Sequence, residues 1–374
     1  MLKQLADIRV IEMGTFITGP AAAMQLADLG AEVIKVERPE TGDPFRAFKG
    51  GLYSPHFQTY NRNKRSVTLD TREAEDLARM DELIAGADVF IQNFRPGMAE
   101  KLGVGYERLS GINPRLIYCS ISGFGSSGPD RNRPAFDTVA QAASGFLRLL
   151  LNPARPRVVG PAIADAITGI YGAMGVLAAL HARERTGKGS LVETSMIESM
   201  SYFNLDDFTH YLSEDLVMGP FSRPHVSQSY VFACADGKSI ALHMSSPQKF
   251  WENLLKAIGR PELEADPIFA DRNARIENYE RIAELLLPVF AAQPLAHWQG
   301  RFAEFEVPHS EVAEPAAVLA SEQGRHLGLE VAAPSPLGGT FRTVRNPLSF
   351  DGERMDEVAA PPVLGQDNAA LFGS

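Results

Sequence analysis

The stretch of sequence that decides the fold runs from residue 8 to residue 37 and reads IRVIEMGTFITGPAAAMQLADLGAEVIKVE. Its opening run, Ile8 to Met13, is apolar and predicts a buried strand. Pro20 to Leu29 predicts a helix, because proline suits the first helical turn and Gly30 is suited to follow the last one. Glu32 to Glu37 predicts a second strand. This order of elements indicates a βαβ unit in a parallel sheet.

The same alternation continues through the first half of the chain. Short apolar runs predict further strands at residues 66–69, 89–92 and 116–121. Asp70 is placed to cap a helix over residues 71–85, since aspartate accepts hydrogen bonds from the first N–H groups of a helix. Repeated strands and helices predict an α/β fold with a mostly parallel sheet covered on both faces. We therefore expect a large Rossmann-like domain in residues 1–200.

The pattern changes after residue 200, and a second domain is expected there. Residues 201–224, which contain Gly219-Pro220, are predicted to form a linker. Residues 225–320 predict a smaller α+β domain that begins with a β-hairpin turning at Asp236-Gly237. Residues 325–374 lack the helices to fold alone, so we expect them to complete the large domain.

Composition narrows the classes of partner. The chain has 374 residues and a formal net charge of -10, which argues against nucleic acid or an anionic membrane as the main partner. Cys119 and Cys234 form no CxxC pair and predict buried, inert thiols. The histidines form no metal-ligating pattern, so no metal is expected. Without a signal-peptide pattern or an apolar run long enough to cross a bilayer, a cytoplasmic enzyme is expected.

The turn after the first predicted strand, Gly14 to Pro20, occupies the place of the phosphate-binding turn of a dinucleotide fold. Glu37 falls about where such a fold carries its ribose-binding acid. The spacing is not GxGxxG, which disfavours a nicotinamide-dependent dehydrogenase. Two interpretations remain: a turn whose backbone N–H groups cradle a nucleotide-bearing ligand, or a plain connection between strand and helix.

Basic residues cluster near the predicted strands of an otherwise acidic chain: Arg38, Arg62, Lys64, Arg65, Arg72, Arg95 and Lys101. We place them at or after the carboxyl ends of strands, where open α/β sheets bind ligands. Each alone is typical of a solvated surface charge, but the set predicts a phosphorylated ligand. Asn93 and Phe94 directly follow a predicted strand. Phe94 could stack on an adenine and Asn93 could form a hydrogen bond with it. The alternative is a loop with a buried aromatic residue.

Asp165 follows Gly160-Pro161 and precedes a helical run in which Gly169, Gly172 and Gly175 recur every third residue. A carboxylate beside a bare helix face is a nucleophile that a bulky ligand can approach. Near the helix N-terminus it is expected to stay ionised, as a nucleophilic carboxylate must. The simpler alternatives are a helix cap for Asp165 and close helix packing for the glycine stripe.

A series of short motifs runs along nearly the whole chain: Gly19-Pro20, Glu32 to Arg38, Asn63 to Ser66, Asn93 to Gly97, Gly123 to Gly125, Arg133 to Asp137, Thr186 to Gly189 and Pro361 to Gly365. Each is weak alone, but their order is specific. In these motifs the chain resembles the family III CoA-transferases, which include formyl-CoA transferase, carnitine CoA-transferase and alpha-methylacyl-CoA racemase.

The resemblance implies that Asp165 is the catalytic nucleophile of a CoA-transferase. It would attack the thioester of a donor acyl-CoA, form a mixed anhydride and then an aspartyl-CoA thioester, and pass CoA to an acceptor carboxylic acid. CoA and acyl-CoA are then substrates, with no permanently bound cofactor. By the same match, the CoA site comprises Phe16, Thr18, Arg38, Leu69, Arg72, Asn93, Phe94, Lys101, Phe136 and Asp137. The resemblance also implies an interlocked homodimer.

Three departures from the family pattern bear on the activity. Phe136 stands where the racemases carry a catalytic histidine, which counts against a racemase, and where many transferases carry tyrosine. The glycine-rich lid of formyl-CoA transferase has no counterpart around residues 222–229. Asp367-Asn368 replaces a His-Thr pair. The alternatives to a CoA-transferase are an acyl-CoA racemase or isomerase, and a CoA-binding protein without transfer activity.

Overall fold

The computed structural model describes residues 2–245 and 247–373, and the chain forms two compact units. Unit 1 comprises Met1–Leu147, Val158–Phe208 and Arg325–Ser374, and unit 2 comprises Arg148–Arg157 and Thr209–Gly324. The segment 201–224, expected as a linker, therefore divides between the units after Phe208. The loop 148–157 groups with unit 2.

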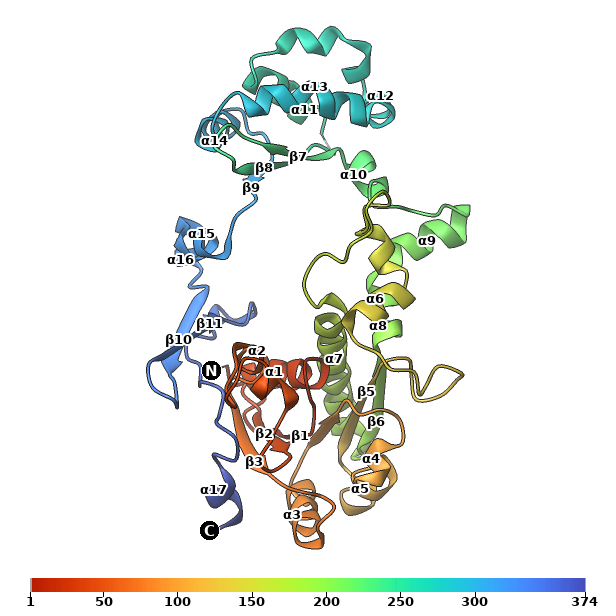
Figure 1. Cartoon of the computed structure of the whole chain (residues 1–374), viewed down its shortest axis with the longest axis vertical. Helices are drawn as coiled ribbons and strands as arrows, with labels where there is room; N and C mark the ends of the chain where they lie inside the picture. The colour runs from red at the N-terminus through yellow and green to blue at the C-terminus, as the bar shows by residue number, and fades with distance from the viewer. Residues whose placement is uncertain (1, 246, 374) are drawn as a thin grey trace. The chain divides into compact units, whose positions relative to one another are not determined.

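Unit 1 is built on a six-stranded parallel sheet in the order β3-β2-β1-β4-β5-β6 (Figure 1). Its strands are β1 (Arg9–Glu12), β2 (Glu32–Glu37), β3 (Lys64–Thr68), β4 (Val89–Gln92), β5 (Ile117–Ser122) and β6 (Ser190–Ser195). Val10 of β1 lies opposite Val33 of β2 and Val89 of β4. The expected parallel α/β sheet is confirmed. In this strand order the connections reverse between β1 and β4, where ligands bind at the carboxyl ends of the strands.

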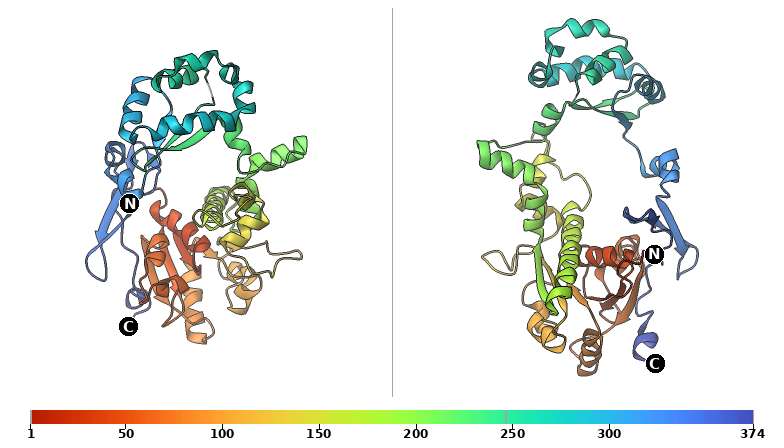
Figure 2. Two further views of the ribbon diagram at one scale, coloured as in Figure 1. Left: turned by 45° about the horizontal axis from the view of Figure 1, so that its top comes forward. Right: turned by 180° about the vertical axis from the view of Figure 1, so that it is seen from behind.

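Helices cover both faces of the sheet (Figures 1 and 2). Those of unit 1 include α1 (Thr18–Asp28), α2 (Pro55–Tyr60), α3 (Ala74–Ala85), α4 (Met98–Lys101), α5 (Tyr106–Ile112), α6 (Asp137–Ala143), α7 (Ile163–Thr186), α8 (Met196–Phe203) and α17 (Asn368–Phe372). On one face, α1 and α7 bury Leu26 and Val176 against the strands. On the other, α3 and α5 bury Met80 and Leu109.

The glycine stripe of α7 lies against other parts of unit 1. A Cβ at Gly169 would come within 2.8 Å of Ala21 Cβ and 3.1 Å of Thr18 O in α1, and one at Gly172 within 3.0 Å of Ile121 Cδ1. Gly169 and Gly172 are therefore covered by α1 and β5 and do not form an open face for a ligand. Close helix packing, the simpler of the two interpretations, is correct.

The same helix corrects the expectation that no segment is long and apolar enough to cross a membrane. By length and composition α7 would qualify, with a mean hydropathy of 1.6 over its most apolar window. Its first turn carries Asp165, and Thr168, Gly169 and Gly172 are buried inside unit 1. We interpret it as the central helix of that unit, since core helices meet the same criterion.

Asp70 does not cap a helix as predicted. α3 begins at Ala74 with Glu73 in the capping position, and the side chain of Glu73 makes no cap hydrogen bond. The Asp70 carboxylate instead accepts from Arg72 Nε at 2.8 Å and from the Arg72 backbone N–H at 3.1 Å. A guanidinium two residues away offers a charge-assisted partner, which competes successfully with a helix N–H group.

The C-terminal segment of unit 1 runs beside β3, the edge strand of the sheet. Asp367 Oδ2 accepts from Ser66 N and Asn368 Oδ1 accepts from Thr68 N, both at 2.9 Å. Before it come a two-stranded sheet of β10 (Glu330–Pro334) with β11 (Thr340–Val344) and a short pairing of β12 (Ser349–Phe350) with β13 (Glu353–Arg354). Asp367 and Asn368, which depart from the family pattern, therefore have a structural role. Their side chains accept hydrogen bonds from backbone N–H groups of the edge strand β3.

Unit 2 contains an antiparallel sheet in the order β7-β8-β9, made of β7 (Ser229–Ala233), β8 (Ser239–His243) and β9 (His309–Glu311). Its helices include α10 (Ser222–Ser227), α11 (Lys249–Ala257), α12 (Arg272–Glu277), α13 (Tyr279–Ala291), α14 (Leu295–Glu304) and α15 (Pro315–Ala320), while α9 (Leu205–Glu214) and α16 (Glu322–His326) cross the unit boundaries. The predicted hairpin is confirmed, with Cys234 N donating to Lys238 O across the turn. Trp251 and Phe290 lie in the core of this unit.

Replacing Gly169 by alanine should lower the free energy of unfolding by about 1–3 kcal/mol, because the new methyl group meets backbone and a short side chain that have no room to move. The matched control is Gly111→Ala in α5, where the added Cβ meets nothing within 4 Å. The control should be neutral or stabilising by up to about 1 kcal/mol, since alanine favours helix. Urea denaturation measures both; equal effects at the two positions would contradict the packing argument.

Candidate active site

Asp165 lies in the first turn of α7, but it does not cap that helix. The capping position belongs to Ala162, whose side chain makes no cap hydrogen bond. Asp137 of α6 supplies the cap: its Oδ1 accepts from the backbone N–H groups of Ala164 at 2.8 Å and of Asp165 at 3.3 Å. The helix-cap interpretation of Asp165 is therefore wrong. Within residues 2–245 and 247–373, no group donates a hydrogen bond to the Asp165 carboxylate.

Two carboxyl groups thus lie together at the start of α7. Asp137 also accepts a 2.6 Å hydrogen bond from Gln141 Nε2. Burial raises the pKa of Asp165 to about 7, and the neighbouring Asp137 carboxylate adds to the shift. The expectation that the helix end keeps Asp165 fully ionised is therefore wrong. Its physical basis is missing, because Asp137 already occupies the first N–H groups that would have stabilised the charge.

A third ionisable group, Tyr60, ends α2 beside this pair. Burial raises the pKa of its phenol, and the charges of Asp165 and Asp137 raise it further, so the three groups are near neighbours. Ala162, just before α7, packs against the same small core as Tyr60. The end of α2 and the segment that leads into α7 therefore pack against one small core. Sequence analysis missed Tyr60, since an isolated tyrosine carries no motif.

A group of aromatic rings includes Phe136, which directly precedes Asp137 in the chain. The ring of Phe16, in the turn after β1, meets those of Phe45, Phe48 and Phe136 edge to face, with centroids 5.2, 6.3 and 6.0 Å away. Phe48 is 54% exposed and Phe136 is 61% exposed. Large apolar side chains left this open beside polar groups are typical of a binding surface. Of these rings, sequence analysis singled out Phe16 and Phe136.

The turn between β1 and α1 is held by Asn93. Its Nδ2 donates to Thr15 O and to Thr18 Oγ1, both at 2.8 Å, and its Oδ1 accepts from Thr15 N at 2.9 Å. Both amide hydrogens of Asn93 are used inside the protein, and Thr18 is buried. Asn93 and Thr18 therefore shape this turn. Hydrogen bonding of Asn93 to an adenine, one of the two interpretations of this loop, would require Asn93 to give up these contacts.

Glu37 does not serve as a free acid for a ribose. Arg46 binds both of its carboxylate oxygens at 2.7 Å, and Ser66 Oγ and Asp43 N donate to it at 2.8 and 3.0 Å. Burial raises the pKa of Glu37, but the hydrogen bonds from Arg46 and the charge of Lys35 outweigh that effect and hold it below its usual value. This carboxylate is part of the core.

Part of the predicted phosphate-binding set is also structural. β3 starts at Lys64, so Arg62, Lys64 and Arg65 lie at the amino end of the strand, opposite to where ligands bind. Arg62 pairs with Asp28 at 2.6 Å, Lys64 with Glu12 at 2.8 Å, and Arg65 with Glu32 and Asp367 at 2.8 and 3.1 Å. These three assignments are wrong because the strand begins two residues earlier than the apolar run indicates.

The remaining basic candidates lie on the expected side of the sheet. Arg38 follows β2 and is exposed, and Arg72 follows the adjacent β3 with its side chain 69% exposed. The Asp70 carboxylate binds Arg72, and the charge of Arg38 also lowers its pKa, so the two arginines flank it. Lys101 ends α4 and is exposed. Leu69 is buried in the core between these elements, so its side chain helps to position the loop and is not free to contact a ligand.

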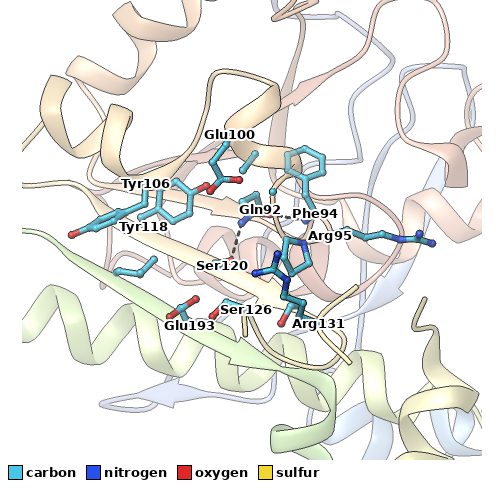
Figure 3. A pocket seen from close by; sticks show the side chains of 15 residues that line it. Gln92, Phe94, Arg95, Glu100, Tyr106, Tyr118, Ser120, Ser126, Arg131 and Glu193 are labelled. Atoms are coloured by element: carbon cyan, nitrogen blue, oxygen red, sulfur yellow. Dashed lines mark hydrogen bonds between the residues drawn. The ribbon is translucent and has the colours of Figure 1, made fainter. Parts of the chain in front are cut away.

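A recess of about 240 Å³ lies beside β4, β5 and β6 and is lined by alternate residues of β5 and β6 (Figure 3). Gln92 crosses its floor, donating to Ser120 Oγ at 2.9 Å and accepting from Phe94 N at 2.6 Å. Arg131 and Glu193 stand at its side. Phe94 therefore borders this recess, with part of its ring against the core. Asp165 is not among the residues that line it.

Unit 1 is thus an α/β unit whose strand order reverses between β1 and β4. It has a half-buried pair of carboxyl groups at the start of α7 and exposed arginines after β2 and β3. In the part of the chain that the structure describes, no group of three or more histidine, cysteine, aspartate or glutamate side chains is arranged to hold a metal ion. The model of the family described as CoA-transferase family III matches residues 5–368. The chain belongs to that family.

Relatives with activities in their names match almost end to end. The chain is 35% identical to the succinyl-CoA–D-citramalate CoA-transferase of Chloroflexus aurantiacus, covering 99% of this chain and 93% of the relative. It is 34% identical to the acetyl-CoA:oxalate CoA-transferase of Acetobacter aceti, covering 97% and 93%. The crystal structure of a CAIB/BAIF family protein from Brucella suis superposes with a TM-score of 0.86 at 31% identity, covering 97% of each chain.

Replacing Asp165 by asparagine should stabilise the protein at high pH and not at low pH. A carboxyl whose pKa rises on folding contributes stability while protonated, fully below its unfolded pKa of about 4. That contribution is lost as the pH rises through about 7, the pKa in the folded protein. Asparagine stays neutral, so its advantage in free energy of unfolding should grow between these values and then level off.

Urea denaturation of both proteins across that pH range measures the difference. Asp7→Asn, at an exposed position, controls for the loss of one surface charge. A constant difference at all pH values would contradict the raised pKa of Asp165.

Proposed function

We propose that this chain moves CoA between carboxylic acids, with Asp165 as the nucleophile. The observation that carries the proposal is the position of this carboxylate, in the first turn of α7, with Asp137 occupying the N–H groups of that turn. Because Asp137 caps the helix, the Asp165 carboxylate is available to react. Family membership and the names of the relatives support the reaction class.

The proposed reaction consists of four acyl transfers. The Asp165 carboxylate attacks the carbonyl carbon of the donor acyl-CoA, and the C–S bond breaks to give a mixed anhydride and CoA thiolate. The thiolate attacks the aspartyl carbonyl, releases the donor acid and forms an aspartyl-CoA thioester. The acceptor carboxylate then attacks this thioester and forms a second anhydride with release of thiolate. Attack of the thiolate on the acceptor acyl carbon gives the new acyl-CoA and regenerates Asp165.

Burial suits Asp165 to these steps. A carboxylate with a raised pKa is a better nucleophile than an ordinary one, and a partly desolvated carboxylate gains more from forming a neutral anhydride or thioester. The same pKa of about 7 means that the nucleophilic form predominates only above neutral pH. We propose that the Phe16, Phe48 and Phe136 rings line the path of the thioester to this carboxylate.

If Asp165 is the nucleophile, Asp165→Asn should lower turnover by roughly a thousandfold or more, as removal of a nucleophile does. CoA binding and the fold should persist. The assay uses a panel of acyl-CoAs and carboxylic acids with mass spectrometry of the CoA products, starting with succinyl-CoA, acetyl-CoA and oxalate. Wild-type protein incubated with an active donor should form an adduct that hydroxylamine traps at Asp165. Near-normal turnover of the asparagine variant would contradict the proposed role of Asp165 as nucleophile.

For CoA we propose that Arg38 and Arg72 contact phosphate groups, with Lys101 at the same edge of the sheet. Arg38→Ala and Arg72→Ala should each weaken CoA binding by about 1–3 kcal/mol, the range for charge-assisted hydrogen bonds. Calorimetry measures the affinities. Arg108→Ala is the control, because Arg108 forms an exposed ion pair with Asp81 on the surface of unit 1. If both variants bind CoA as the control does, the phosphates are held elsewhere.

We further propose that the protein is a homodimer, as the family resemblance implies. An apolar face of α7 and α8 supports this: Ile170 is 50% exposed, Met174 55% and Tyr202 64%. Exposed groups of large apolar residues mark association surfaces. Sedimentation should show dimers down to nanomolar concentration, and Met174→Lys should favour monomers. A folded, active wild-type monomer would refute the dimer.

A further inference from the structure

A buried cluster of charged side chains lies beneath the turn between β1 and α1. Lys35 Nζ is 2.8 Å from Glu12 Oε1 and 3.1 Å from Asp43 Oδ2, and Lys64 Nζ is 2.8 Å from Glu12 Oε2. The Glu12, Lys35, Asp43 and Lys64 side chains are all removed from solvent. Buried ion pairs contribute little net stability, since desolvation offsets their attraction. The main effect of this cluster is therefore on the geometry of the turn above it.

Two residues of the cluster, Lys35 and Asp43, form hydrogen bonds with the backbone of the turn. Lys35 Nζ donates to Gly14 O at 2.7 Å. Asp43 Oδ1 accepts from Phe16 N at 3.1 Å and from Phe45 N at 2.9 Å. Asp43 therefore ties the turn after β1 to the segment after β2 in which Phe45 lies, while its second oxygen faces Lys35. The two phenylalanines joined by this carboxylate are the two whose rings meet 5.2 Å apart.

Phe16 needs such a restraint because its backbone has a φ of 60°. This left-handed conformation is unfavourable for a bulky residue and persists only where neighbouring groups enforce it. With the turn in this shape, the Phe16 ring also meets that of Phe136, which directly precedes Asp137. The conformation of one backbone residue thus places an aromatic ring next to the segment that carries the carboxyl pair.

We propose that Asp43 is a positioning residue for the acyl-transfer site, acting through Phe16. Asp43 is 1% exposed and does not itself reach the substrate. By accepting from Phe16 N it holds the left-handed turn, and the turn holds the Phe16 ring as part of the apolar surface against which the thioester end of acyl-CoA lies. This inference rests on the proposed function of Asp165, and it assigns a task to a buried acid that has no part in the chemistry.

A double-mutant cycle between Asp43 and Phe16 tests the inference. Asp43→Ala should lower kcat/KM for the acyl-CoA donor by about tenfold to a hundredfold, the range for a small misplacement of a reacting group. In a Phe16→Ala background, Asp43→Ala should lower kcat/KM by no more than about twofold, because the ring that Asp43 positions is already absent. Asp43→Asn should keep more activity than Asp43→Ala, because its side-chain oxygen can still accept from Phe16 N and Phe45 N. It should stay below the wild type, because its Nδ2 replaces the oxygen that faces Lys35.

The control is Asp28→Ala, which breaks the buried pair with Arg62 elsewhere in unit 1. It should lower stability, but its effect on kcat/KM should be the same with and without the Phe16 ring. If Asp43→Ala does not fold, the cycle is run with Asp43→Ser, whose side chain is too short to reach both N–H groups.

Equal losses from the Asp43 change in both backgrounds, or no loss in a folded variant, would overturn the positioning role. Failure of the proposed function looks different. In that case the wild-type protein transfers no CoA with any substrate pair, or Asp165→Asn keeps its activity.

Discussion

The close contact between α7 and α1 is the constraint on which the rest of unit 1 depends. Gly169 lets the two helices approach until a single methyl group would meet Ala21 and the Thr18 carbonyl. This contact places the first turn of α7 next to the turn that leads into α1. Asp165 and Phe16, far apart in sequence, are consequently brought to one edge of the sheet. A larger residue at Gly169 would move the first turn of α7, which carries the proposed nucleophile, away from the turn that carries Phe16.

Several charged side chains of unit 1 form buried ion pairs with one another. Lys35, Lys64, Arg46 and Arg62 are buried and paired with acids, so these four basic groups are not free to bind a ligand. Asp165 differs from the acids in these pairs, because it is half-buried and has a carboxyl neighbour in place of a cation. The physical consequence is a carboxyl group that is costly to ionise and is correspondingly reactive once ionised.

Much of the fold followed from local patterns. The strand at 32–37 and the strand at 89–92 have the predicted bounds, and the hairpin of unit 2 turns where Asp236-Gly237 predicts. Strand starts were less well predicted: the apolar run at 66–69 hid the first residues of β3, which are charged. Because of that difference, three of the seven basic residues of the predicted phosphate site lie at the amino end of β3 and not at its carboxyl end.

By itself, the sequence determined the α/β class, the order of its elements, the family motifs and Asp165 as the candidate nucleophile, because hydrophobic periodicity and short motifs are local properties. The tertiary structure alone decided which acid caps α7, why the pKa of Asp165 rises, which glycines pack, and that Tyr60, Phe45 and Phe48 surround the site. Each of these depends on contacts between segments tens of residues apart. Burial and partner choice arise from such contacts, so no local pattern of residues encodes them.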